Sequence, residues 1–389
     1  MKSVAIMNKI YINSIKQISA QNPLVEDWFE NPVFYSEPYV RSIEPDYKQY
    51  FTPNEARRLG KILKRALLVS RQTMAESGVA MPDAIITGTG LGCIESTEIF
   101  LDKLVREGEE FLNPTHFMQS THNTIGSLIA IDTKCHAYNT TYAHKGISFE
   151  CALQDAFMQL ITGVANNALV GAHDEMTPAY YNMLKKAGYL DFGYEIRDLG
   201  CETNLKSITF AGETAVAMML STEKSDKTWC EIDFLDMRYD TGDLRFENRD
   251  MRYETSPQSQ ISNLKSQISN PDYIMTGING NPENDKVYVE NCAKLFPNVP
   301  LLQYKNIFGE SYTAPALGVY AAATCLKKGE IPDFLMCDMG YETRYMRCEM
   351  RDMRCEKNLK SQISNLKSKI LCYNHFENKN HTFILLNKS

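Results

Sequence analysis

The hydrophobic positions of this chain switch between two spacings along its length. Short apolar runs rich in Val, Ile and Ala predict strands over residues 4–18, 84–87, 168–171 and 215–220. Apolar residues at helical spacing predict helices over residues 56–77, 96–107 and 148–160. Because helices separate successive strands, we expect an α/β layered fold with largely buried central strands.

Local signals place one helix and one turn. Thr52–Glu55 supplies an N-cap, a proline at the first helical position and an acidic first turn, and Gly78 predicts the end of that helix. The run Gly88–Gly92 follows a predicted strand, as nucleotide-binding loops do. That fingerprint needs a glycine three residues beyond its second glycine, where this chain has Cys93. We therefore interpret the run as a tight strand-to-helix turn without a ligand.

Two stretches break the alternation of strands and helices. Residues 237–270 and 339–370 share the string SQISNLKS, found at Ser259–Ser266 and Ser361–Ser368. A string that occurs twice without a regular period is not the signature of a repeat fold. We interpret both stretches as insertions in surface loops, where added length costs little free energy. An exposed binding arm rich in Arg, Met and Tyr is the alternative.

Composition and charge exclude several classes of function. With 389 residues, 43% of them hydrophobic, the chain can bury a large core. Its 48 acidic residues outnumber the 41 basic ones and no basic stripe is present, which argues against a nucleic-acid partner. The N-terminal residues carry neither a signal-peptide core nor a membrane span, so we expect a cytoplasmic protein. The 11 cysteines form no CxxC pair and the seven histidines lack zinc-ligand spacing, so we expect no metal and no cofactor.

Several motifs resemble those of the β-ketoacyl synthases in their order along the chain. The clearest are Asn284–Asp285, Gln303–Glu310 and an alanine-rich stretch over Ala314–Ala322. Further matching pieces are Pro53–Gly78, Asp83–Gly92, Phe210–Ala215 and Gly329. The resemblance implies a five-layered α-β-α-β-α thiolase-like fold built from two similar halves, residues 1–235 and 236–389. It also implies a dimer, with an active site between the halves of each chain.

Condensation in this family needs a cysteine thiolate at a helix N-terminus and two histidines that stabilise the thioester enolate. The family's nucleophile turn corresponds to Thr141–Gly146, and the nucleophile falls at Ala143 or at Gly146, depending on which side the count starts from. Neither is a cysteine. Cys135 and Cys151 flank this turn, and we interpret them as packed thiols.

The two histidine positions fall at Gly277 and at Glu310, and no histidine occurs between His173 and His375. Lys305 matches a lysine that supports the family's site. Phe376 matches the phenylalanine of a C-terminal loop whose glycines are absent here. Without glycines, we expect that loop to lose the backbone conformations that point an amide at an oxyanion.

Other side chains then occupy the degenerate site. Thr141, His144, Lys145 and Phe376 are the candidates for an acyl pocket, and Glu310 is expected to pair with Lys305 or with His144.

A ketosynthase-like chain without its cysteine resembles the chain-length factors. The resemblance implies a heterodimer with an active ketosynthase that builds an acyl chain on an acyl carrier protein, in polyketide, aryl polyene or fatty-acid-type assembly. Two alternatives remain open. One is an acyltransferase or hydrolase that uses Cys135 or Ser148 as a relocated nucleophile, and the other is an eroded chain without a role.

Overall fold

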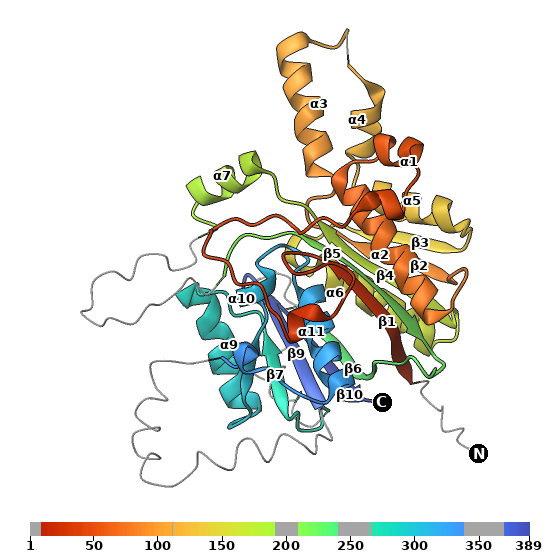
Figure 1. Ribbon diagram of the computed structural model, residues 1–389. Helices are drawn as coiled ribbons and strands as arrows, with labels where there is room; N and C mark the ends of the chain where they lie inside the picture. Colours follow the sequence, from red (N-terminus) through yellow and green to blue (C-terminus); the bar gives the residue numbers. More distant parts are fainter. Residues whose placement is uncertain (1–8, 111, 191–208, 240–263, 265–266, 338–368) are drawn as a thin grey trace, which may run out of the picture.

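The computed structural model describes residues 9–110, 112–190, 209–239, 264, 267–337 and 369–389. Within these residues, ten strands form one sheet in the order β3-β2-β4-β5-β1-β6-β10-β9-β7-β8 (Figure 1). Most of 237–270 and nearly all of 339–370 lie outside the described residues, so their interpretation as insertions stays a prediction.

The N-terminal half contributes five neighbouring strands. They are β1 (Ile10–Ile18), β2 (Ala84–Gly88), β3 (Tyr138–Tyr142), β4 (Asn167–Asp174) and β5 (Thr214–Ser221). Strand β2 runs parallel to β3 and β4, whereas β5 runs antiparallel to β4 and β1. Helices α2 (Lys61–Ser77) and α5 (Thr124–Thr133) cover the outer face and bury their apolar sides against it.

The C-terminal half contributes the other five strands. They are β6 (Cys230–Tyr239), β7 (Tyr273–Thr276), β8 (Leu301–Gln303), β9 (Lys369–Phe376) and β10 (Asn380–Lys388). Strand β10 lies antiparallel between β6 and β9, and β7 runs parallel to β8 and β9. Helix α9 (Pro282–Leu295) packs on the outer face through Tyr288 and Leu295.

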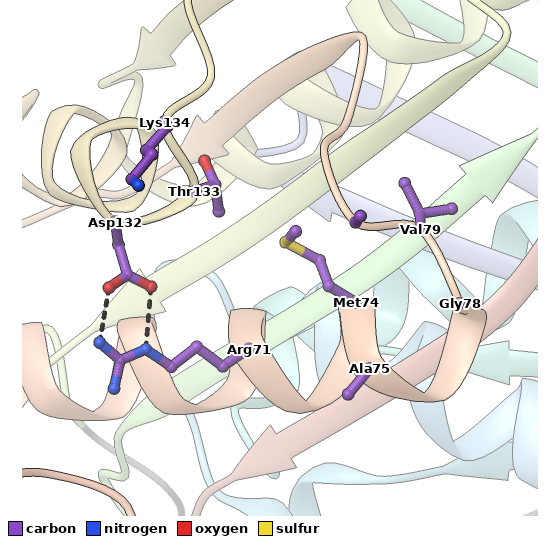
Figure 2. Close-up of a pocket in the computed structure, with 9 residues that line it drawn as sticks. Arg71, Met74, Ala75, Gly78, Val79, Asp132, Thr133 and Lys134 are labelled. Carbon is purple, nitrogen blue, oxygen red and sulfur yellow. Dashed lines mark hydrogen bonds and ion pairs between the residues drawn. The ribbon is translucent and has the colours of Figure 1, made fainter.

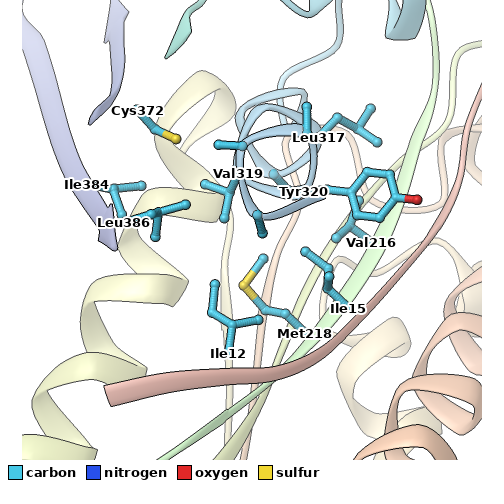
Figure 3. Close-up of a cluster of buried hydrophobic side chains, with 14 of the residues drawn as sticks. Ile12, Ile15, Val216, Met218, Leu317, Val319, Tyr320, Cys372, Ile384 and Leu386 are labelled. Carbon is cyan, nitrogen blue, oxygen red and sulfur yellow. The ribbon is translucent and has the colours of Figure 1, made fainter. Parts of the chain in front are cut away.

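Two helices fill the space between the halves of the sheet. Helix α6 (Ser148–Ile161) and helix α11 (Pro315–Lys328) share one apolar cluster with strands of both halves. Figure 3 shows side chains of α11 lying between Met218 of β5 on one side and Leu386 of β10 on the other. The layers are therefore α-β-α-β-α, and the five-layered α/β fold predicted from the sequence is confirmed.

The two halves of the sheet are joined at a short seam. Strand β1 pairs with β6 through three residue pairs, Ile10 with Ile232, Tyr11 with Glu231 and Ile12 with Cys230. The predicted boundary between residues 235 and 236 falls inside β6.

The remaining described helices are α1 (Pro53–Arg58), α3 (Ile94–Glu107), α4 (Pro114–Gln119), α7 (Pro178–Lys186) and α10 (Lys305–Phe308). Helices α3 and α4 project together from the body of the molecule (Figure 1). No helix in the described ranges is long and apolar enough to cross a membrane.

The helix predicted over residues 56–77 is interrupted. Thr52 forms the predicted N-cap, with a complete capping box to Glu55, and Gly78 ends α2 at φ 77°. Between these points Leu59 and Gly60 are extended, and Gly60 is the N-cap of the second helix, so the prediction of one continuous helix is wrong. Glycine has a low helix propensity, and it supplies the break here.

Candidate functional site

The glycine-rich run Gly88–Gly92 folds around a carboxylate of the chain itself. Asp174, at the end of β4, accepts hydrogen bonds from Thr89 Oγ1 (3.1 Å), Gly90 N (2.9 Å) and Leu91 N (2.9 Å) through Oδ1. Burial raises the pKa of Asp174 to about 6, and these hydrogen bonds oppose that shift. The backbone amides that could approach a phosphate are therefore already occupied, in line with a structural turn.

The turn expected to carry a nucleophile lies between β3 and α6. Ala143, His144 and Lys145 are exposed, whereas Gly146 is buried. Lys145 holds φ at 50°, which is unusual for a residue other than glycine. Ser148 fixes the turn because its Oγ donates to Lys145 O (2.8 Å) and accepts from His144 N (2.8 Å). The turn places no thiol at either expected position.

At Gly146 an aromatic ring takes the space of a side chain. A Cβ atom added there would lie 2.3 Å from Cδ2 of Phe376. Phe376 ends β9 and is packed onto the turn before α6, so this position cannot hold a cysteine without moving the ring.

The first histidine position is also filled. Gly277 directly follows β7, and a Cβ atom there would lie 2.3 Å from the Tyr288 hydroxyl and 2.9 Å from Asn374 Oδ1. Tyr288 donates to Asn374 Oδ1 (2.9 Å), and His375 N donates to the Tyr288 hydroxyl (3.2 Å). A hydrogen-bonded pair from α9 and β9 thus occupies the volume that an imidazole would need.

The second histidine position carries an ion pair. Lys305 Nζ lies 2.7 Å from Glu310 Oε2, and Asn279 Nδ2 donates to the same oxygen (2.8 Å). The expected pairing of Glu310 with Lys305 is confirmed. His144 does not contact Glu310; its Nδ1 lies 3.8 Å from Cys151 Sγ.

A cavity of about 500 Å³ lies beside these positions, and we call it the central cavity. Four positions named from the sequence line it, namely Gly146, Lys305, Glu310 and Phe376. Its other walls are rich in amides, supplied by Asn279, Asn281, Asn284, Asn374 and Asn378.

The other candidate positions lie outside the set that lines the central cavity: Thr141, Ala143, His144, Lys145 and Gly277. Thr141 is held in β3 by a hydrogen bond to the Thr87 hydroxyl (2.9 Å), and His144 and Lys145 are on the surface. Of the four residues named for an acyl pocket, only Phe376 contributes to this cavity.

Two titratable residues of this region were missed by sequence reasoning. His375 lines the central cavity from β9, donates through Nε2 to Asn284 O (3.0 Å), and has its pKa lowered to about 4 by burial. Glu150, in the first turn of α6, is wholly buried and accepts from Asn374 Nδ2 (2.6 Å). Only its place beside Phe376 in the sequence pointed to His375, and nothing local pointed to Glu150.

None of the alternative nucleophiles is activated. Cys135 is buried and donates to Pro82 O (3.2 Å), and Ser148 is committed to the turn described above. Burial raises the pKa of Cys151 to about 11, which keeps its thiol protonated. Among the described residues no group of three or more His, Cys, Asp or Glu side chains is gathered to hold a metal.

A second pocket lies on the outer face, between the C-terminal ends of α2 and α5. It has a volume of about 440 Å³, and Figure 2 shows Arg71 of α2 reaching Asp132 of α5 across it. The two side chains form a bidentate ion pair (2.8 and 2.5 Å). This pair ties the two helices together, and the pocket shares no residue with the central cavity.

The C-terminal hairpin turn adopts left-handed conformations although it lacks glycine. Glu377 and Asn378 hold φ at 54° and 52° in a turn closed by Lys379 N donating to Phe376 O (3.1 Å). These are the left-handed conformations of a type I′ turn, which normally favours glycine and asparagine. The loop therefore holds left-handed conformations without glycines, because closure of the β9–β10 hairpin imposes them. The expected loss of an amide directed at an oxyanion stays a prediction.

Replacing Glu377 by glycine is expected to raise the free energy of unfolding by about 1 kcal/mol, because glycine adopts a positive φ without steric cost. Urea denaturation measures the change. Lys379→Gly is the matched control, since Lys379 is not among the residues with positive φ, and it is expected to lower stability. Equal effects of the two substitutions would contradict strain at Glu377.

Comparison with known proteins gives one family match and many structural ones. Residues 41–261 match the family profile described as "Beta-ketoacyl synthase, N-terminal domain". No curated protein sequence matches the chain.

Solved structures with this fold include a ketosynthase in complex with its chain length factor from Xenorhabdus doucetiae, at 15% identity and a TM-score of 0.70, with 100% of both chains covered. Another is the ishigamide ketosynthase/chain length factor, at 14% and 0.68, covering 98% of this chain and 100% of that one. A third is a β-ketoacyl synthase from Burkholderia phymatum, at 12% and 0.69, with the same coverage. At 12–15% sequence identity, these similarities establish the fold alone.

Proposed function

Since the chain belongs to the β-ketoacyl synthase family, we propose that it is a non-catalytic subunit of the chain-length-factor type. In this proposal it pairs with an active β-ketoacyl synthase that assembles a polyketide, aryl polyene or fatty-acid-type chain on an acyl carrier protein. The observation that carries the proposal is the filling of the catalytic positions by other side chains.

Condensation requires a thiolate to hold the acyl chain and donors to stabilise the enolate. Here the turn before α6 carries no thiol, and Phe376 covers Gly146. Tyr288 and Asn374 fill the space at Gly277, and Glu310 is paired with Lys305. These contacts are mutually satisfied, so they support a folded structural role for the former site rather than a new catalytic one.

An open sheet edge supports the presence of a partner subunit. Strand β3 is the last strand on its side of the sheet, and its outer edge has no partner strand among the described residues. Exposed edges of this kind are normally paired or covered. Beside it Tyr138 is 41% exposed and Ile131 of α5 is 74% exposed, and the exposed turn Ala143–Lys145 follows directly. We infer that a second subunit pairs with this edge of the sheet.

The proposed role is physical rather than chemical. The partner's cysteine holds the growing chain, while this subunit completes the dimer and limits the room into which the chain extends. We expect the pair to work in the cytoplasm.

Affinity purification of the tagged chain from its own host, followed by mass spectrometry, tests the proposal. We expect an equimolar ketosynthase that keeps its cysteine and both histidines. Tyr138→Arg, at the edge strand, is expected to reduce its recovery at least about tenfold, because a charge buried at an interface is costly.

Lys286→Glu, on the exposed side of α9, is the matched control and should leave recovery unchanged. Purification of the chain as a homodimer alone would count against the proposal. So would a covalent acyl adduct on the isolated chain after incubation with an acylated carrier protein, because that outcome requires a working nucleophile here.

A further inference from the structure

The carboxyl group of Glu150 is buried beneath the wall of the central cavity. Glu150 has no exposed surface and lies in the first turn of α6, four positions after Gly146. Oε1 accepts a hydrogen bond from Asn374 Nδ2 (2.6 Å) of β9. Oε2 has no hydrogen-bond partner among the described residues. The group is therefore half satisfied, and it is joined to the β9–β10 hairpin by a single side-chain bond.

Among the described residues, no positive charge forms an ion pair with this carboxyl group. Lys305 of α10 is near enough to favour the charged form, but its ammonium group is paired with Glu310. The phenols of Tyr288 and Tyr304 are buried, and burial raises the pKa of each. Burial raises the pKa of Glu150 to about 7, because a charge there would be poorly solvated.

Two neighbouring titratable groups, Cys151 and His375, are neutral around that pH. Cys151, next to Glu150 on α6, has its pKa raised to about 11, and His375 on β9 has its pKa lowered to about 4. Between pH 6 and pH 8 the charge of Glu150 therefore changes, whereas the charges of Cys151 and His375 do not.

The end of the hairpin that Glu150 holds also closes the cavity. Phe376, two residues after Asn374, packs its ring on Gly146, and both residues line the central cavity. The adjoining turn is strained, since Glu377 and Asn378 both hold positive φ. Asn374 and His375 anchor this end to Glu150, Tyr288 and Asn284. The hydrogen bond from Asn374 by itself favours the ionised carboxyl group, whereas burial opposes ionisation more strongly. Movement of the strained hairpin end would expose this group to water and remove the cost of burial.

We propose that Glu150 is a pH-sensitive latch for the β9–β10 hairpin. When its carboxyl group is neutral, the hairpin end stays in place and Phe376 covers Gly146. When it ionises, the charge favours a state in which the hairpin end moves away and water from the cavity solvates the carboxylate. The latch belongs to this chain alone and does not depend on a partner subunit.

Hydrogen exchange of the full chain, followed by mass spectrometry at pH 6 and pH 8, tests the latch. After correction for the intrinsic exchange rate, the protection factors of residues 369–380 are expected to fall about tenfold from pH 6 to pH 8. The reason is that Glu150 regains its ordinary pKa of about 4.5 when the hairpin end opens, so a higher pH favours the open state. Strand β2 should keep its protection at both pH values.

Glu150→Gln retains an acceptor for Asn374 but cannot ionise, so its hairpin should be equally protected at pH 6 and pH 8. The matched control is Glu175→Gln: burial also raises the pKa of Glu175 to about 7, but its hydrogen bond is to Glu95 N, away from the hairpin. This control should keep the tenfold change.

A wild-type hairpin with constant protection would overturn the proposal, as would a tenfold change that persists in Glu150→Gln. If Glu150→Gln does not fold, the wild-type pattern decides. The loss must be confined to the hairpin and the first turn of α6, and a loss spread over the whole sheet overturns the latch.

Discussion

Replacing Arg65 by methionine is expected to lower the free energy of unfolding by about 3–5 kcal/mol, the usual cost of removing one member of a buried ion pair. Arg65 lies in α2 with 1% of its side chain exposed. It contacts Glu44 (2.5 Å) and Glu213 (3.0 Å), and Glu213 is itself 3% exposed. Methionine fills much of the volume but leaves the Glu213 charge buried without its counter-ion. Urea denaturation at neutral pH measures the loss.

Arg71→Met is the matched control on the same helix. Arg71 also contacts two carboxylates, Asp132 and Glu55, but 28% of its side chain is exposed. Water solvates the carboxylates when the arginine is removed, so the loss should stay below about 1 kcal/mol. If both variants lose the same amount, burial is not what makes the Arg65 pair important.

The second large effect is expected at the glycine-rich turn. At pH 5, Asp174→Ala should lower the free energy of unfolding by about 3 kcal/mol, because the amides of Gly90 and Leu91 and the Thr89 hydroxyl lose their acceptor inside the protein. Asp174→Asn keeps an acceptor oxygen and should lose much less. Urea denaturation of both variants measures the difference. An alanine variant as stable as the wild type would contradict the role of the carboxylate.

The pH dependence of the Asp174→Asn variant has a definite sign. The pKa of Asp174 is about 6 in the folded chain against an ordinary value of 3.8. The stability linked to this group is therefore complete below pH 3.8 and is lost as pH rises through 6. Asparagine removes that loss, so the stability of Asp174→Asn relative to the wild type should rise by about 2.4 kcal/mol between pH 4 and pH 8. Parallel curves would show that Asp174 does not titrate in this way.

Elements with strong local signals were predictable from the sequence. Thr52 caps a helix and Gly78 ends one because both effects depend on a few neighbouring residues. Strands β3, β6, β7, β8, β9 and β10 were not predicted one by one, since their identity as strands depends on pairing across the sheet. Residues 4–8 of the first predicted strand lie outside the described residues, and β1 begins at Ile10.

The site was predictable only in part, because several of its contacts join residues that are distant in sequence. The loss of the cysteine and of two histidines follows from the sequence, and the Lys305–Glu310 pair spans only five positions. The contact between Glu150 and Asn374 joins residues 224 positions apart, and it exists only because α6 packs beside β9. The residues that line the cavity could not be assigned either, because the resemblance gives the order of motifs in the sequence and not their positions in three dimensions.

The position of β1 has a consequence for biosynthesis. Residues Ile10–Ile18 are made well before their partners, because the strand pairs on one side with β5, from Thr214, and on the other with β6, from Cys230. Its apolar residues therefore stay unpaired during synthesis until β5 has been made. Contacts so distant in sequence make folding slow. Newly made chains therefore expose an unpaired apolar strand early, and yield in the cell should depend strongly on chaperones and on the rate of translation.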